Sequence, residues 1–148
     1  MMRIIEEHEC VCGKCLFNSK NTEFVAWGKK TKFILINNGN KLVDEFIVDD
    51  CLLKLRIREE KCDYLFLIQE VKTAYLVECK GSDILKAVEQ LNSTLDILKN
   101  DLLGFTLKAK IIPTKVYPPN MLTNSYKKLR ARLNGNLETK NIVCTEII

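Results

Sequence analysis

Residues 62–81 read CDYLFLIQEVKTAYLVECKG, two apolar runs joined by a few polar residues. Near-continuous apolar character is typical of strands that are buried on both faces, such as the central strands of an α/β sheet. We therefore predict strands over 62–68 and 73–79. Because the two runs are adjacent in the chain and the connection is short, we expect them to pair antiparallel.

The ends of these two strands carry charges that core packing does not require. Asp63 opens the first run, and Glu78 and Lys80 close the second, with Cys79 between them. In an antiparallel pair the start of the first strand lies beside the end of the second, so the charges are expected to converge at one edge of the sheet. Alternation places Glu78 and Lys80 on one face and Cys79 on the other.

Two neighbouring carboxylates repel each other, and burying them is costly unless a cation lies between them. Carboxylate oxygens with room for water are the ligands that Mg²⁺ or Mn²⁺ prefers. Such an ion lowers the pKa of bound water and neutralises charge on a phosphate, and a nearby lysine assists the attacking water. The pattern therefore predicts phosphodiester hydrolysis.

The segment after the second strand has helical periodicity. Apolar residues recur at three- and four-residue intervals, which predicts an amphipathic helix over 82–100, capped by Ser82 or Asp83. A second, basic helix is predicted over 121–135, with Gly135 just past its end. The apolar positions of the first helix are Ile84, Ala87, Val88, Leu91, Leu95 and Leu98.

Further strands complete the predicted sheet. Asn38-Gly39 separates the apolar runs 31–38 and 41–50, which predicts a β-hairpin. The alternation over 51–61 predicts another strand that ends in a polar turn at 59–61, and 107–119 predicts a short strand. Residues 1–30 are expected to be irregular, and 137–148 to form a strand or an irregular tail. The predicted fold class is therefore α/β, a mixed central sheet flanked by helices with an N-terminal β-hairpin.

Length and composition limit the class of protein. The 148 residues predict a single domain over 1–148, and 47% hydrophobic with 28% charged residues is ordinary for a protein with a packed core. Apolar runs fall short of the roughly 18 residues that span a bilayer, and the polar start MMRIIEEHEC does not resemble a signal peptide. We therefore expect a cytoplasmic protein whose cysteines are reduced thiols, those at 51, 62 and 79 behaving as small hydrophobes.

Two further groups of residues suggest binding sites. His8, Cys10, Cys12 and Cys15 are suitable zinc ligands, but their spacing is tight and a second cysteine pair is missing, so we interpret them as local thiols and keep zinc as the alternative. Between 107 and 140, lysines and arginines greatly outnumber acids, which suits a polyanion or a solvated face. The candidate phosphate contacts are Lys115, Lys127, Lys128, Arg130 and Arg132.

Asp63, Glu78-x-Lys80 and the following helix sequence ILKAVEQL (84–91) resemble the PD-(D/E)XK, or restriction-endonuclease-like, nuclease superfamily. The resemblance covers residues 49–117. It implies a four-stranded mixed core sheet flanked by helices, Mg²⁺ or Mn²⁺ as cofactor, and DNA as the commonest substrate. It also implies that Asp63 and Glu78 bind the metal, that the Cys79 carbonyl is a further ligand, and that Lys80 assists the nucleophile.

The chain departs from the family pattern at several positions. Cys62 replaces the proline of the motif, and the acid that many members carry on an N-terminal helix has no clear match. Gln90 resembles a glutamine that exonuclease-like members place near the metal, but Thr94 follows where a tyrosine is usual. The nearest acidic candidates for a supporting role are Glu45, Asp49 and Asp50.

Two functions of different classes remain. The first is a metal-dependent DNA endonuclease that takes part in restriction, repair, mobile elements or antiviral defence. Because so short a chain has little room beyond a catalytic core, we expect it to act as a homodimer or with a partner protein. RNA stays open as a substrate. The second is a catalytically inactive binding or regulatory subunit that uses the same core. A third reading, a solvated charge pair at the edge of an unrelated sheet, assigns Glu78 and Lys80 no function.

Overall fold

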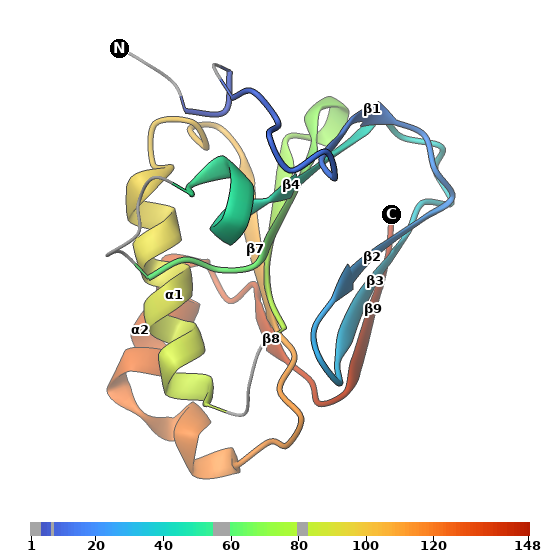
Figure 1. The fold of residues 1–148 in the computed structure, drawn as a ribbon. Coiled ribbons are helices and arrows are strands. Elements are labelled where there is room, and N and C mark those ends of the chain that lie inside the picture. Colours follow the sequence, from blue (N-terminus) through green and yellow to red (C-terminus); the bar gives the residue numbers. More distant parts are fainter. Residues whose placement is uncertain (1–3, 7, 55–59, 80–82) are drawn as a thin grey trace.

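The structure is a computed structural model that describes residues 4–6, 8–54, 60–79 and 83–148, with Asp50 described by its backbone only. Figure 1 shows three layers: two helices on one side, a large sheet in the middle and a smaller sheet on the other side. Among the described residues, no helix combines the length and the apolar character needed to cross a bilayer.

The large sheet has six strands in the order β1-β4-β5-β6-β7-β8. Neighbouring strands are antiparallel from β1 to β6 and parallel from β6 to β8. The predicted mixed sheet is thus confirmed. The strands are β1 (Leu16–Ser19), β4 (Val43–Ile47), β5 (Tyr64–Ile68), β6 (Thr73–Glu78), β7 (Thr106–Ile111) and β8 (Leu137–Thr139).

The antiparallel pairing of β5 and β6 is confirmed. Tyr64 lies opposite Val77, and the two strands are joined by the short helix η2 (Gln69–Val71) with Lys72 at a φ of 47°. Both faces of the pair are buried, because Leu65 and Leu76 pack into one hydrophobic cluster while Phe66 packs into another. This explains why the sequence of β5 and β6 shows almost no alternation.

The two helices cover one face of the large sheet, as Figure 1 shows. Helix α1 (Ile84–Ile97) matches its prediction, and the Asp83 carboxylate caps it by accepting a hydrogen bond from the Lys86 N–H at 3.0 Å. It connects the parallel strands β6 and β7. Helix α2 (Asn124–Arg132) follows the short helix η3 (Pro118–Leu122), and Gly135 just after it has a φ of 86°.

The other face of the large sheet is covered by a second sheet of three strands. Strands β2 (Glu23–Trp27) and β3 (Lys32–Ile36) form a hairpin, and β9 (Val143–Ile147) pairs with β3 in parallel. The expectation that residues 1–30 are irregular is therefore wrong, since β1 and β2 lie there. The predicted flanking by helices holds for one face only.

The hairpin predicted over 31–50 is wrong. Strand β3 belongs to the small sheet, whereas β4 belongs to the large sheet. The Asn37 side chain organises the connection by accepting from the Lys41 N–H at 2.9 Å and donating to the Lys41 carbonyl at 2.8 Å. The positive φ falls on Asn40, at 51°, so Asn38-Gly39 does not form a two-residue hairpin turn that would pair the strands.

The strand predicted over 51–61 is wrong where the structure describes this segment. Residues 48–52 form a short π-helix, η1 (Val48–Leu52), and residues 55–59 lie outside the described residues. Cys51, Leu52 and Leu53 are all buried, although a strand would point the middle residue to the opposite face. Lys61, placed by the prediction in a polar turn, is also buried.

Candidate active site

Asp63 immediately precedes β5 and lies between η1 and strand β6. Its N–H donates to the Val77 carbonyl at 3.0 Å, and its carbonyl accepts from the Val48 N–H at 2.9 Å. Its side chain is 5% exposed, and Oδ2 accepts a hydrogen bond from the Cys79 N–H at 2.9 Å. The carboxylate is therefore fixed against the end of β6, next to Glu78.

Glu78 is the last residue of β6 and is 1% exposed. Leu65 and Leu76 lie opposite each other and face the helices. Asp63 is two positions before Leu65 and Glu78 two positions after Leu76, so both acids belong to the same face of the sheet. Burial raises the pKa of the Cys62 and Cys79 thiols, and the negative charges of Asp63 and Glu78 raise both pKa values further. Both carboxylates are therefore close to both thiols. The structure thus brings the two predicted acids together in a buried place.

The predicted motif has two further members, Cys79 and Lys80. Lys80 lies outside the described residues. The Cys79 carbonyl accepts a hydrogen bond from the Thr31 hydroxyl at 2.5 Å, and a Cβ added at Gly28 would overlap the same oxygen. The predicted metal-binding role of this carbonyl stays a prediction, and it would have to use the second lone pair of the oxygen.

Glu45, one of the acidic candidates, is not part of this group. It pairs with Phe66 across the β4–β5 ladder and shares the face of the large sheet that packs against the small sheet. Burial raises its pKa to about 7. Its carboxyl group is thus separated from Asp63 and Glu78 by the sheet itself.

Asp49 lies in η1 and forms an ion pair of 3.4 Å with the buried Lys61, two residues before Asp63. The Asp50 side chain is outside the described part of the chain. Gln90 is half-buried on α1, and its backbone carbonyl accepts a hydrogen bond from the Thr94 hydroxyl at 2.8 Å. Lys61 is a buried cation that sequence analysis missed, because it stands in a run of charged residues.

Thr94 is a further residue that sequence analysis did not select for the site. Its hydroxyl oxygen accepts a hydrogen bond from the Cys62 N–H at 2.9 Å and so ties the middle of α1 to the residue before Asp63. The side chain is completely buried. A lone threonine inside an amphipathic helix gives no signal of such a role, since the sequence does not show which backbone group its hydroxyl will meet 32 residues away.

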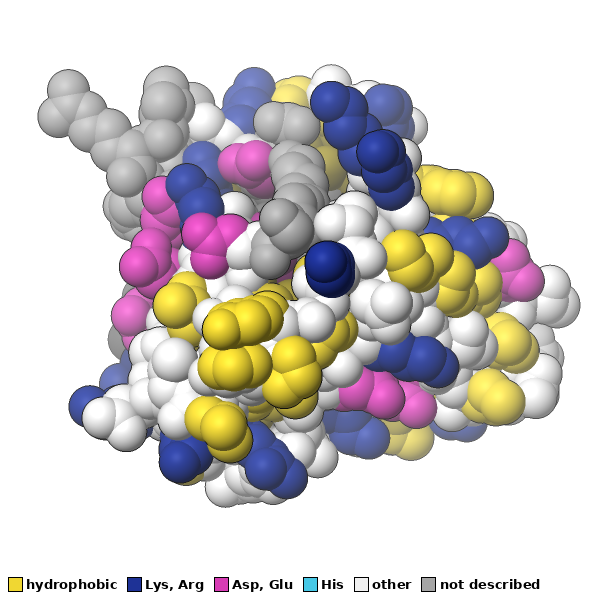
Figure 2. Space-filling model, turned by 90° about the horizontal axis from the view of Figure 1, so that it is seen from below, with side chains coloured by type: hydrophobic (Ala, Val, Ile, Leu, Met, Phe, Trp, Pro, Cys, Tyr) yellow, Lys and Arg dark blue, Asp and Glu magenta, His cyan; other side chains and the backbone are white. Residues whose placement is uncertain are grey.

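The predicted phosphate-binding residues are not equivalent. Lys115, Lys127 and Lys128 are exposed. Arg132 instead bridges the two helices, with an ion pair of 2.7 Å to Asp96, and Arg130 lines a cavity. Figure 2 shows basic side chains spread around this end of the molecule, with hydrophobic side chains gathered between them, rather than one continuous basic patch.

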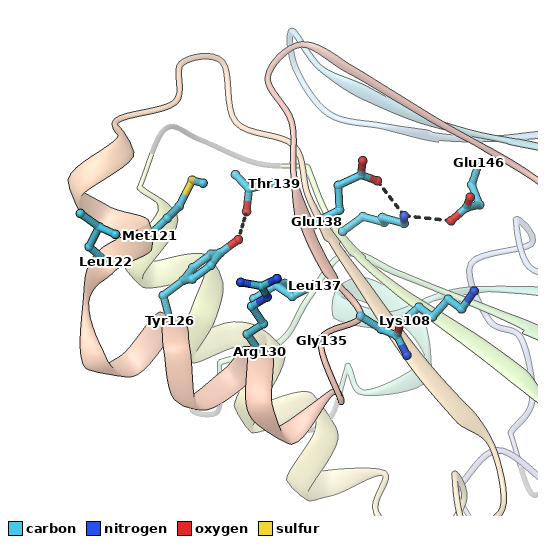
Figure 3. Close-up of a pocket in the computed structure, with 12 residues that line it drawn as sticks. Lys108, Met121, Leu122, Tyr126, Arg130, Gly135, Leu137, Glu138, Thr139 and Glu146 are labelled. Atoms are coloured by element: carbon cyan, nitrogen blue, oxygen red, sulfur yellow. Dashed lines mark hydrogen bonds and ion pairs between the residues drawn. The ribbon is translucent and has the colours of Figure 1, made fainter.

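A cavity of about 700 Å³ lies between α2, β7, β8 and β9, and neither Asp63 nor Glu78 is among its lining residues. Figure 3 shows the Tyr126 hydroxyl in contact with Thr139, at 2.9 Å, on one side of it. Glu138 and Glu146 lie on the other side (Figure 3), and Lys110 bridges them at 2.7 Å and 2.9 Å respectively. The charge of Lys110 is thus paired with one carboxylate from each sheet.

A second cluster of reactive side chains lies near the N-terminus. His8, Cys10 and Cys15 meet Cys51 of η1, and their ligand atoms all lie within 4.8 Å of one another. Burial lowers the pKa of His8, which favours its neutral imidazole. The first three residues were predicted as possible zinc ligands together with Cys12, whereas Cys51 was assigned to the core because it stands in an apolar run, 36 residues beyond Cys15.

In comparisons with protein-family models, curated protein sequences and solved structures, no match to this chain was found.

Proposed function

We propose that the chain is a divalent-metal-dependent nuclease whose active site is built from Asp63, Glu78 and Lys80. The observation that carries this proposal is the meeting of two buried carboxylates at the adjoining ends of β5 and β6. Two carboxylates buried side by side form a favourable place for a cation, because their negative charges repel each other and a cation between them offsets that repulsion.

The topology around the acids supports the same proposal. Strands β4, β5, β6 and β7 are consecutive neighbours, paired antiparallel, antiparallel and parallel, and α1 crosses between the last two. This arrangement is consistent with the four-stranded mixed core that the resemblance to restriction-endonuclease-like nucleases implies. The small sheet on the opposite face is a difference from a core flanked by helices on both sides.

The donor set fits a hard cation such as Mg²⁺ or Mn²⁺, because both side chains offer carboxylate oxygens. Asp63 and Glu78 would hold the ion, which supplies an activated water and neutralises charge on the scissile phosphate. The Cys79 N–H keeps the Asp63 carboxylate oriented, and Lys80 would stabilise the attacking water. The exposed Lys127 and Lys128 on α2 would contact phosphates without reading sequence.

The test is cleavage of supercoiled and linear DNA, and of RNA, by the purified chain with and without added Mg²⁺ or Mn²⁺. Asp63→Asn, Glu78→Gln and Lys80→Ala are each expected to lower the rate on the order of 100-fold or more while the fold is retained. Metal is omitted rather than chelated, because a chelator would also extract ions from a thiol site.

Glu45→Gln is the matched control, since it is a buried acid of the same sheet that lies on the opposite face. It should cleave at the wild-type rate. Cleavage that is equal in all variants, or that does not depend on added metal, would contradict the proposal. DNA binding without cleavage in the wild type would replace it with the non-catalytic subunit.

A further inference from the structure

The N-terminal cluster joins two segments that are far apart in the sequence. His8, Cys10 and Cys15 precede β1, whereas Cys51 lies in η1 after β4. Pairing of β1 with β4, Leu16 opposite Glu45, brings the two segments together. In Figure 1 the N-terminal segment, drawn in blue, accordingly passes beside the short helix that follows β4.

The distances within the cluster match those around one tetrahedral ion. With bonds of about 2.3 Å to sulfur and about 2.0 Å to nitrogen, a tetrahedral site separates two sulfurs by about 3.8 Å and a sulfur from a nitrogen by about 3.5 Å. The Cys51 Sγ lies 3.8 Å from the Cys15 Sγ and 3.9 Å from the Cys10 Sγ. The His8 Nε2 lies 3.6 Å from the Cys51 Sγ and 3.9 Å from the Cys15 Sγ.

The surroundings hold these ligands in place. Cys51 is 3% exposed, and the His8 ring packs at 5.9 Å against the ring of Phe46, which belongs to the core. The N-terminal segment is also tied down by the Ile5 N–H, which donates to the Asp101 carboxylate at 2.8 Å. The imidazole and the thiols are therefore gathered by the fold of the chain.

The donor chemistry selects the ion. Three thiolates and one imidazole in a tetrahedron favour Zn²⁺ over the hard cations that carboxylates prefer. The spacing suits one ion, because all four donor atoms are close enough to touch a common centre. A complete set of four protein ligands has no open position for a substrate, which is the arrangement of a structural rather than a catalytic zinc site.

Cys12 stands beside this set. Its Sγ lies 3.6 Å from the Cys10 Sγ and 4.0 Å from the Cys15 Sγ, and it accepts from the Lys14 N–H at 3.4 Å. It is not among the residues whose ligand atoms all lie within reach of one another. Cys12 is thus a neighbouring thiol that is not one of the four proposed ligands.

We propose that His8, Cys10, Cys15 and Cys51 bind a structural Zn²⁺ ion that fastens the N-terminal segment to η1. The Val48 N–H at the start of η1 donates to the Asp63 carbonyl, so the ion also supports the segment that positions this carboxylate. The zinc site does not depend on the proposed nuclease activity, because it shares no ligand with Asp63 and Glu78.

The test is the metal content of the protein purified under reducing conditions without chelator. We expect one zinc ion per chain by mass spectrometry of the metal. After replacement by Co²⁺, we expect the visible bands of a tetrahedral ion and the sulfur-to-cobalt charge-transfer band. Cys51→Ser and His8→Ala should each weaken zinc binding more than ~100-fold in chelator competition. His8 is half-buried and lies outside the helices and strands, so its replacement removes a ring contact with Phe46 but no residue of the core cluster itself.

Cys12→Ser is the matched control and should retain the ion, as should Glu78→Gln. Absence of zinc and of cobalt binding in the reduced wild-type chain would overturn the proposal. Loss of zinc in Cys12→Ser to the same extent as in Cys51→Ser would overturn the ligand set. Loss in Glu78→Gln would place the ion at the carboxylates instead. None of these results depends on whether the chain cleaves DNA.

Discussion

Single buried acids in this chain have different environments although they belong to the same sheet. Asp63 accepts a backbone hydrogen bond at the end of β6, whereas Glu45 faces the aromatic residues between the two sheets. Burial raises the pKa of Glu45 to about 7, which makes the protonated form the favoured one in the folded protein below that pH.

This environment predicts a pH dependence of stability that Glu45→Gln removes. Since the folded-state pKa is raised, the folded protein retains a proton that the unfolded chain loses, and the free energy of unfolding falls as pH rises from about 4.5 to about 7. At pH 8 the variant should be more stable by about 2–3 kcal/mol, and at pH 4 the two should be equal. Urea unfolding across this range measures the difference, and parallel curves would contradict it.

Among the elements, α1 does more than cover the sheet. Its apolar side chains fill the core, and Thr94 reaches from it to the N–H of Cys62, just before β5. The helix therefore sets the position of the strand start that carries Asp63.

Thr94→Val is expected to destabilise the protein by about 1–3 kcal/mol, because the buried Cys62 N–H loses its acceptor. Thr94→Ser keeps the hydroxyl group and is the control, with only the loss of a methyl group, about 1 kcal/mol. Hydrogen exchange of the Cys62 amide separates the two effects. It should accelerate in the valine variant and stay slow in the serine variant, and equal rates would show that the hydrogen bond contributes nothing.

At the scale of the whole molecule, a buried lysine joins the two sheets. Lys110 on β7 contacts Glu138 on β8 of the large sheet and Glu146 on β9 of the small sheet. Burial alone would lower the pKa of Lys110, but the two carboxylates raise it above its usual value. The ion pairs thus fix how the C-terminal strands bring the sheets together.

Lys110→Met should lower the free energy of unfolding by about 2 kcal/mol, because it leaves two carboxylates facing each other without a cation. The effect is smaller than for a fully buried pair, since the Glu138 side chain is 50% exposed. Lys127→Met, on the exposed side of α2, is the control and should change stability by less than about 0.5 kcal/mol. Equal stability of the two variants in chemical denaturation would contradict this role of Lys110.

Local patterns in the sequence were sufficient for β5, β6, α1, β7 and α2, and for the convergence of Asp63 and Glu78. These features depend on neighbours a few residues away: apolar periodicity reports which faces of an element are buried, and a short connection makes two strands pair. The meeting of Asp63 and Glu78 could be predicted because they stand at the adjoining ends of two strands, and the short connection determines how those strands pair.

Only the tertiary structure decided which sheet each outer strand joins and which distant residues meet. Strands β3 and β4 look alike in sequence, yet they separate because β3 pairs with β9 at the far end of the chain. The meeting of Cys51 with His8 and the separation of Glu45 from Glu78 have the same origin. Periodicity shows that a side chain is buried, but long-range pairing determines against which partner, because that choice is made by contacts between segments far apart in the chain.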